Sequence, residues 1–144
     1  LRDQVVERRQ LALRHRGEAH ITVITPPEHD AALKDFVSIE RIHDIALNHN
    51  IQDSSFEVVC LGKGEKEGRQ LLQTFFVVVR SPELVAIREQ VEVEYLAAGG
   101  DPEKFSAAVF YPHITLGFTD RDLHLSDGVV KDGSSCDGEI ATVD

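Results

Sequence analysis

The chain has 144 residues, of which 42% are hydrophobic and 28% charged, so it can bury one ordinary globular core. Its formal net charge is -10 at pH 7, which argues against broad binding to nucleic-acid backbone, because that binding depends on Lys and Arg. No apolar run is long enough to span a bilayer, and no segment has the pattern of a signal peptide. We therefore expect a single domain with no membrane contact, located in the cytoplasm or nucleus.

The first residue of the chain and its two cysteines lead to further expectations about its origin and redox state. The sequence begins at Leu1 and contains no Met, which favours a domain cut from a longer protein over a processed chain. Cys60 lies in an apolar stretch and Cys136 in one rich in Gly and Ser, and without a secretion signal we expect two reduced thiols. No Cys/His cluster has the spacing of zinc ligands, so we expect no metal.

The first third of the chain is predicted to be mostly helical. Periodicity and turn residues predict a helix over Asp3–Arg16, a strand over Ala19–Thr25 that ends at a Pro-Pro pair, and a helix over Glu28–Val37. Ser38 is typical of a helix N-cap, and Asn48–Asn50 would end the helix that follows. The expected inner side of that helix is formed by Ile39, Ile42, Ile45 and Ala46.

Two strands and a long helix come next. Ser55–Leu61 and Gln70–Arg80 are strand-like, and residues 62–69 predict a flexible, charged, hairpin-like connection between them. The run Phe75–Val79 is too apolar for a strand that is wet on one side, so we expect a central strand buried on both faces. Ser81 is a typical N-cap before a helix that ends near residue 98.

The last third predicts a strand and a loop-rich tail. A loop over Asp101–Val109 leads to a strand over Phe110–Phe118, which Pro112 interrupts at its entrance. In the tail, Leu123–Leu125 and Ile140–Val143 are candidate short strands. This order of elements predicts an α+β fold with an antiparallel sheet and helices outside it.

Two tetrapeptides share one pattern. His20-Ile21-Thr22-Val23 and His113-Ile114-Thr115-Leu116 each read His, apolar, Thr, apolar. Because residues i and i+2 of a strand point to the same face, each copy places an imidazole and a hydroxyl on one face and two apolar side chains on the other. The copies could be two unrelated core strands or one pocket with two imidazoles and two hydroxyls. We favour the pocket, because two such copies exceed what chance pairing of seven His with Thr would give.

The paired motifs resemble the His-x-Thr-x signatures of the 2H phosphoesterase superfamily. The order of elements around Leu61-Gly62-Lys63-Gly64 and Tyr111-Pro112-His113 is similar to that of its RNA ligase-like and cyclic phosphodiesterase members, and residues 117–123 resemble the fungal RNA-repair-like group called Swiss Army Knife. The resemblance implies a bilobal α+β fold, in which antiparallel sheets line a central cleft that holds both motifs. It also implies hydrolysis of cyclic or 2′-linked ribose phosphodiesters without a metal or cofactor.

We therefore predict a metal-independent phosphodiesterase that opens 2′,3′-cyclic phosphates of nucleotides or RNA ends, with the 2′-phosphate as the product that the resemblance favours. Two imidazoles can supply a base for water and an acid for the leaving oxygen near neutral pH. Thr22 and Thr115 can donate hydrogen bonds to phosphate oxygens. The sequence leaves the roles of the histidines open, and we take His113 as the base and His20 as the acid. The alternatives are a 2′-5′ phosphodiesterase that trims RNA ends and a non-catalytic module that binds nucleotides or RNA ends.

Residues near the motifs are candidates for substrate binding. Tyr111 could stack on a nucleobase or belong to the core, and Phe118 is a second stacking candidate. Lys63 could reach a second phosphate or be a solvated loop charge, and His124 in the tail could approach the same site. Given the acidic charge, the expected partner is a small nucleotide or a single RNA end with a cyclic phosphate, bound by a monomer.

Overall fold

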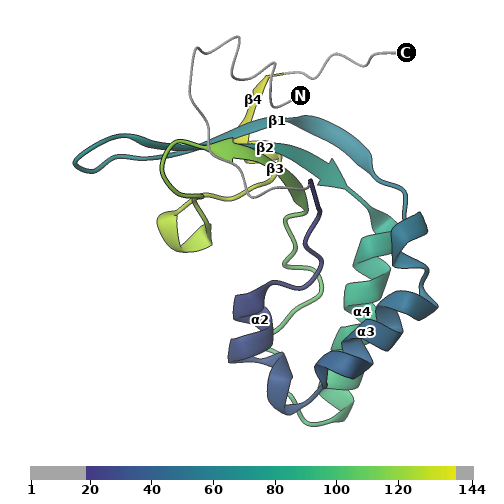
Figure 1. Ribbon diagram of the computed structural model, residues 1–144. Coiled ribbons are helices and arrows are strands. Elements are labelled where there is room, and N and C mark those ends of the chain that lie inside the picture. The colour runs from purple at the N-terminus through teal and green to yellow at the C-terminus, as the bar shows by residue number, and fades with distance from the viewer. Residues whose placement is uncertain (1–18, 139–144) are drawn as a thin grey trace. The chain divides into compact units, whose positions relative to one another are not determined.

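The computed structural model describes residues 19–138, which divide into two compact units (Figure 1). The sheet unit comprises residues 19–21, 58–80 and 111–138, and the helical unit comprises residues 22–57 and 81–110. Each unit is therefore assembled from segments that lie far apart in the sequence. The helix predicted over Asp3–Arg16 and the strand predicted over Ile140–Val143 fall outside the described residues.

The sheet unit is a four-stranded antiparallel sheet with the strand order β3-β2-β1-β4. Its interior strand β2 carries the apolar run Phe75–Val79, and all five residues of that run are buried, so the predicted central strand is confirmed. The strands are β1 (Glu57–Lys66), β2 (Leu72–Arg80), β3 (His113–Phe118) and β4 (Cys136–Gly138).

A buried cluster covers each face of this sheet. On one face, which we call the Phe75 face, Phe75 packs with Leu116 and with the next two alternate residues of β2. On the other face, which we call the Phe76 face, Phe76 packs with Leu123 and Val129 from the segment that follows β3. The two clusters explain why the sequence of β2 lacks polar alternation.

Strand β1 is longer than predicted, because it continues through residues that the sequence assigned to a loop. A Cβ atom at Gly62 would lie 2.2 Å from the ring of Phe76, and one at Gly64 would lie 2.5 Å from Val129. The glycines are therefore sites of close packing inside a strand. In the sequence, glycines next to charged residues look the same in a flexible loop and in a closely packed strand. The prediction of a loop that begins at residue 62 was therefore wrong.

The helical unit contains α2 (Pro26–Ala31), α3 (Ile39–Asn48) and α4 (Pro82–Ala97). Ser38 caps α3 by accepting the backbone N–H of Arg41, and Ser81 caps α4 by accepting that of Leu84, so both predicted N-caps are confirmed. Figure 1 shows α3 and α4 side by side, and Arg41 of α3 donates to Glu94 of α4 at 2.6 Å.

Other boundaries differ from the prediction. The stretch Ala19–Thr25 forms only a single β-bridge, at Ile21, because Thr25 caps α2 and the prolines that follow occupy its first turn. The helix predicted over Glu28–Val37 ends at residue 31 and is followed by a 3₁₀ turn. Leu123–Leu125 is not a strand, since Leu123 packs into the core and residues 125–127 form a 3₁₀ turn.

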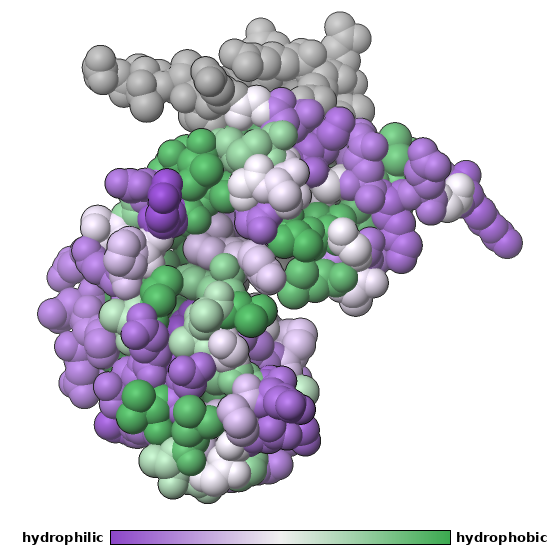
Figure 2. Space-filling model, turned by 180° about the vertical axis from the view of Figure 1, so that it is seen from behind, coloured by the Kyte–Doolittle hydropathy of each residue, from purple (hydrophilic) through white to green (hydrophobic). Residues whose placement is uncertain are grey.

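Apolar side chains also reach the surface. Ile39, which was expected on the inner side of α3, is 57% exposed, and Leu47 and Val93 are exposed as well. Figure 2 shows hydrophobic residues in green among hydrophilic residues in purple on the face that it presents. Scattered apolar residues are normal on protein surfaces, so we assign no partner to them. Within the described range 19–138, every helix is too short or too polar to cross a membrane.

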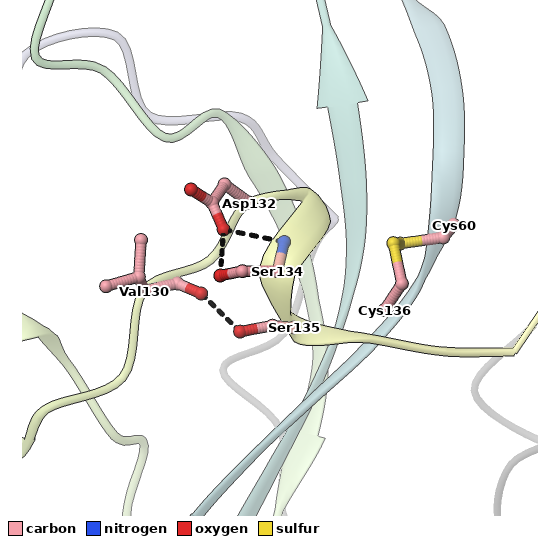
Figure 3. The surroundings of a disulfide bond; sticks show 6 residues. All are labelled: Cys60, Val130, Asp132, Ser134, Ser135 and Cys136. Carbon is pink, nitrogen blue, oxygen red and sulfur yellow. Dashed lines mark hydrogen bonds between the residues drawn. A yellow bond between two sulfur atoms is a disulfide. The ribbon is translucent and has the colours of Figure 1, made fainter.

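Cys60 and Cys136 form a disulfide, so the prediction of two reduced thiols is wrong (Figure 3). Gly62 of β1 pairs with Cys136 of β4, and this register brings the two cysteine Cα atoms to 5.6 Å, within the range that disulfides need. The cysteines are 76 positions apart in the sequence, so local patterns do not reveal this proximity. Disulfides persist mainly in oxidising compartments, so the expected cytoplasmic or nuclear location loses the support of reduced thiols.

Removing this cross-link is expected to destabilise the sheet unit. The double variant Cys60→Ala/Cys136→Ala should lose roughly 2–4 kcal/mol of unfolding free energy, because the open chain gains conformational entropy when it unfolds. Urea denaturation followed by circular dichroism measures this loss. A reductant should destabilise the wild type to a similar extent and leave the variant unchanged. Equal urea midpoints for oxidised wild type and variant would contradict the expectation.

Candidate active site

The second motif presents its polar residues on the Phe76 face of the sheet. His113 pairs with Val78 of β2 and Thr115 pairs with Phe76, and directly opposed residues of antiparallel strands share a face. The ring of His113 also packs edge-on against the ring of Phe76, with the centroids 5.9 Å apart. Ile114 lies on the opposite face against the Phe75 cluster. The alternation predicted for this motif is therefore present in β3.

The first motif begins beside the second one. Ile21 forms an antiparallel bridge with Ile114, and both side chains pack against the Phe75 cluster. In this register His20 lies opposite Thr115, and from strand alternation we expect the side chain of His20 on the Phe76 face, where His113 lies. Within the sheet unit, His113 and Thr115 lie on one face, and His20 is expected on the same face. The fourth, Thr22, is half-buried and is the first residue of the helical unit.

The environment of His113 favours its neutral form. Its Nδ1–H donates to the carbonyl oxygen of Tyr111 at 2.8 Å, and a carbonyl can only accept, so the neutral ring keeps its lone pair on Nε2. Burial lowers the pKa of His113, and the positive charges of Lys131 and His124 lower it further, against the opposing effects of the Tyr111 bond and Asp122. The Nε2 atom can therefore accept a proton at neutral pH.

The segment after β3 brings three more polar groups to this face. Lys131 donates to Asp122 at 3.1 Å, and the hydroxyl of Thr74 donates to the same carboxylate at 2.5 Å. His124 directly follows Leu123, which is fully buried in the Phe76 cluster. The sequence suggested that His124 approaches the site of the two motifs, but it did not identify Asp122 or Lys131. Each of these two residues is next to an apolar residue in the sequence, and this pattern is too common to mark a site.

The turn that carries His124 is fixed by one carboxylate. Asp127 accepts the backbone N–H of His124 at 3.0 Å and also binds Arg121 at 2.8 Å and Lys66 at 3.1 Å. The hydrogen bond from Arg121 is the main reason why the pKa of Asp127 lies far below its usual value. The carboxylate therefore stays charged and keeps the backbone of this turn in place at neutral pH.

Two predicted binding residues lie next to His113 in the chain or on its face. Tyr111 is half-buried, and its carbonyl oxygen holds the His113 ring. Phe118 pairs with Thr74 of β2, which places it at the end of β3 on the Phe76 face. Both residues therefore belong to the surroundings of the second motif.

Lys63 is not brought to this group. It lies in β1, two residues after Leu61, and the side chain of Leu61 packs against the Phe75 cluster. Alternation along β1 therefore places Lys63 on the face opposite His113. There it forms an ion pair with Glu65 at 3.0 Å. A role of Lys63 in binding a phosphate beside His113 has no support from this placement.

Comparison with known proteins gives one family. A family model described as Swiss Army Knife, 2H phosphoesterase domain, matches residues 2–124. This match includes both His-x-Thr motifs and reaches His124. Neither the curated proteins nor the solved structures contain a match to the chain.

Proposed function

This chain belongs to the Swiss Army Knife family of 2H phosphoesterase domains, and from that premise we propose that it hydrolyses 2′,3′-cyclic phosphates of nucleotides or RNA ends. Family membership supports a hydrolase that acts on phosphodiester bonds in general. We further propose that the substrate phosphate is cyclic, that the product is a 2′-phosphate and that the reaction needs no metal.

The observation that carries the proposal is the bridge between Ile21 and Ile114. It aligns the two motifs antiparallel, with both isoleucines on the apolar Phe75 face. The polar positions His20, His113 and Thr115 then share the other face. Two imidazoles on one face are what general acid–base hydrolysis of a phosphodiester requires.

In the proposed reaction, Nε2 of His113 takes a proton from water while the water oxygen attacks phosphorus. The bond from phosphorus to the ribose 3′-oxygen breaks, and protonated His20 gives its proton to that oxygen. The product is a 2′-phosphomonoester. Thr115 and Thr22 donate hydrogen bonds to the non-bridging oxygens, where negative charge must be stabilised.

The charge of the chain supports a small substrate. With a formal net charge of -10, the protein offers little general attraction to extended RNA. A mononucleotide or one RNA end needs only local contacts, for which Tyr111 and Phe118 are the proposed stacking residues. We propose that the protein binds such ligands as a monomer.

Incubation with 2′,3′-cyclic AMP in EDTA tests the function. The expected result is a single product, 2′-AMP, made by the wild type and not by the variant His20→Ala/His113→Ala. Chromatography that resolves 2′-AMP from 3′-AMP measures the outcome. Strong inhibition by EDTA would contradict metal independence. No hydrolysis of the cyclic nucleotide, with cleavage of a 2′-5′-linked dinucleotide in its place, would move the assignment to a 2′-5′ phosphodiesterase, and binding without cleavage would indicate a non-catalytic module.

A further inference from the structure

A buried ion pair lies on the same face of the sheet as His113. The Nζ atom of Lys131 contacts both carboxylate oxygens of Asp122, at 3.1 and 3.3 Å, and the Thr74 hydroxyl donates to one of them. Lys131 is 5% exposed and Asp122 is 8% exposed. Ion pairs buried this deeply often contribute no more stability than apolar residues of the same shape. Stability alone therefore gives no reason for charges at this place.

One aromatic ring connects the pair to His113. The Nζ atom of Lys131 lies 5.5 Å from the centroid of the Phe76 ring, and the same ring packs edge-on against His113. The close approach of Gly62 leaves the Phe76 ring no room to move toward β1. Phe76 is fully buried, so the layer between the pair and His113 has low polarity, and charges act over longer distances there than in water.

We propose that Asp122 and Lys131 are positioning residues that set the protonation of His113 and hold the 122–131 segment on its face of the sheet. The inference rests on the proposed function only in giving His113 the role of base. The pair is suited to this task because its two charges act on His113 with opposite signs and are held at fixed positions by Thr74 and by burial.

The charged groups around His113 determine whether its pKa is raised or lowered. Lys131 and His124 from the segment after β3 favour the neutral ring, whereas Asp122 from that segment favours the charged ring. His20 of the first motif is the other titratable group that alternation assigns to this side of the sheet. Each single variant removes one of two charges that act on His113 with opposite signs, so the two variants should move the pKa of His113 in opposite directions.

The test is an NMR titration of the His113 imidazole in the full chain. Lys131→Met leaves the carboxylate of Asp122 and should raise the midpoint by about one pH unit, whereas Asp122→Asn leaves the ammonium group and should lower it by a similar amount. The double variant Asp122→Asn/Lys131→Met removes both charges, so it should fold and titrate near the wild type. Lys63→Met removes a lysine on the opposite face and should leave the midpoint unchanged.

The kinetics provide a second readout. The acidic limb of kcat/KM for 2′,3′-cyclic AMP should move with the NMR midpoint, up in Lys131→Met and down in Asp122→Asn. Midpoints that stay within about 0.2 units of the wild type, or that move in the same direction in both single variants, would overturn the inference. Opposite shifts without any hydrolysis would support the positioning role and overturn the proposed function, so the two failures are distinguishable.

Discussion

The variant His113→Ala is expected to lose about 100- to 10,000-fold in kcat on 2′,3′-cyclic AMP, because the general base is removed. The loss follows from the hydrogen bond of Nδ1 to the Tyr111 carbonyl, which leaves Nε2 as the proton acceptor. The matched control is His43→Ala, which removes an exposed imidazole from α3 and should leave kcat unchanged. A thermal melt of each variant shows whether the fold survives. Turnover above one tenth of wild type in folded His113→Ala would remove this residue from the mechanism.

The same experiment assigns acid and base when His20→Ala is added. A diester with 4-nitrophenolate as its leaving group needs little protonation of that oxygen, so His20→Ala should recover most of its activity on this substrate. His113→Ala should stay inactive on it, because water still needs a base. The reverse pattern, with recovery in His113→Ala, would exchange the two roles.

What the sequence predicted well depends on neighbours along the chain. Alternation in a strand is a local rule, so the faces of His113, Ile114 and Thr115 follow once β3 forms. Helix capping is equally local, because a serine side chain binds the backbone N–H three residues later, as at Ser38 and Ser81.

What the sequence did not predict depends on segments that meet only in the fold. Thr74 and Asp122 are 48 residues apart in sequence, and their contact requires the tail to return over the Phe76 face. The disulfide requires the register of β4 on β1. The pairing of the two motifs was expected from their repetition alone, and the bridge at Ile21 supplies the register that repetition lacks.

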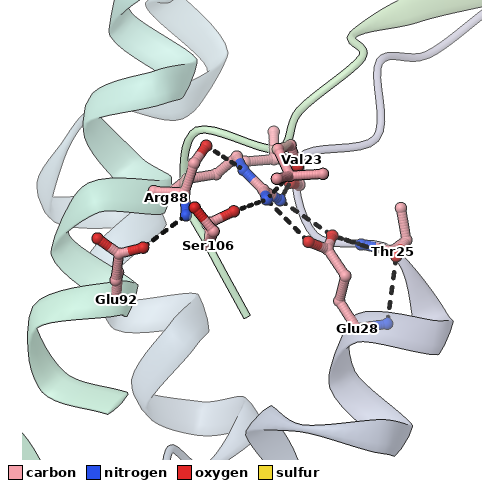
Figure 4. Close-up of polar contacts among 8 residues, drawn as sticks. Val23, Thr25, Glu28, Arg88, Glu92 and Ser106 are labelled. Atoms are coloured by element: carbon pink, nitrogen blue, oxygen red, sulfur yellow. Dashed lines mark hydrogen bonds and ion pairs between the residues drawn. The ribbon is translucent and has the colours of Figure 1, made fainter. Parts of the chain in front are cut away.

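Arg88 is the clearest case of a residue whose role only the fold reveals, and its replacement has the largest expected effect on stability. In sequence it is an ordinary arginine within a helix, yet its side chain is 1% exposed. Figure 4 shows its guanidinium group between Glu28 and the carbonyls of the surrounding loops. It binds both carboxylate oxygens of Glu28, at 2.9 and 2.8 Å, and lies over the rings of Phe105 and Phe110. The carbonyl oxygens that it binds belong to Val23, Ser106, Ala107 and Val109.

The variant Arg88→Ala is expected to lose about 3–5 kcal/mol of unfolding free energy, because it leaves the Glu28 carboxylate and four carbonyl oxygens without this donor. Urea denaturation measures the loss, and Glu89→Ala, an exposed neighbour on the same helix, is the control. Arg88→Lys keeps the charge without the planar fork, so it should also be destabilised, by less than the alanine variant. Val23 directly follows Thr22, and Val109 lies four residues before His113, where β3 begins. Weakening this network should therefore loosen the chain next to both motifs. An Arg88→Ala urea midpoint equal to that of the wild type would show that the loops are held by other contacts.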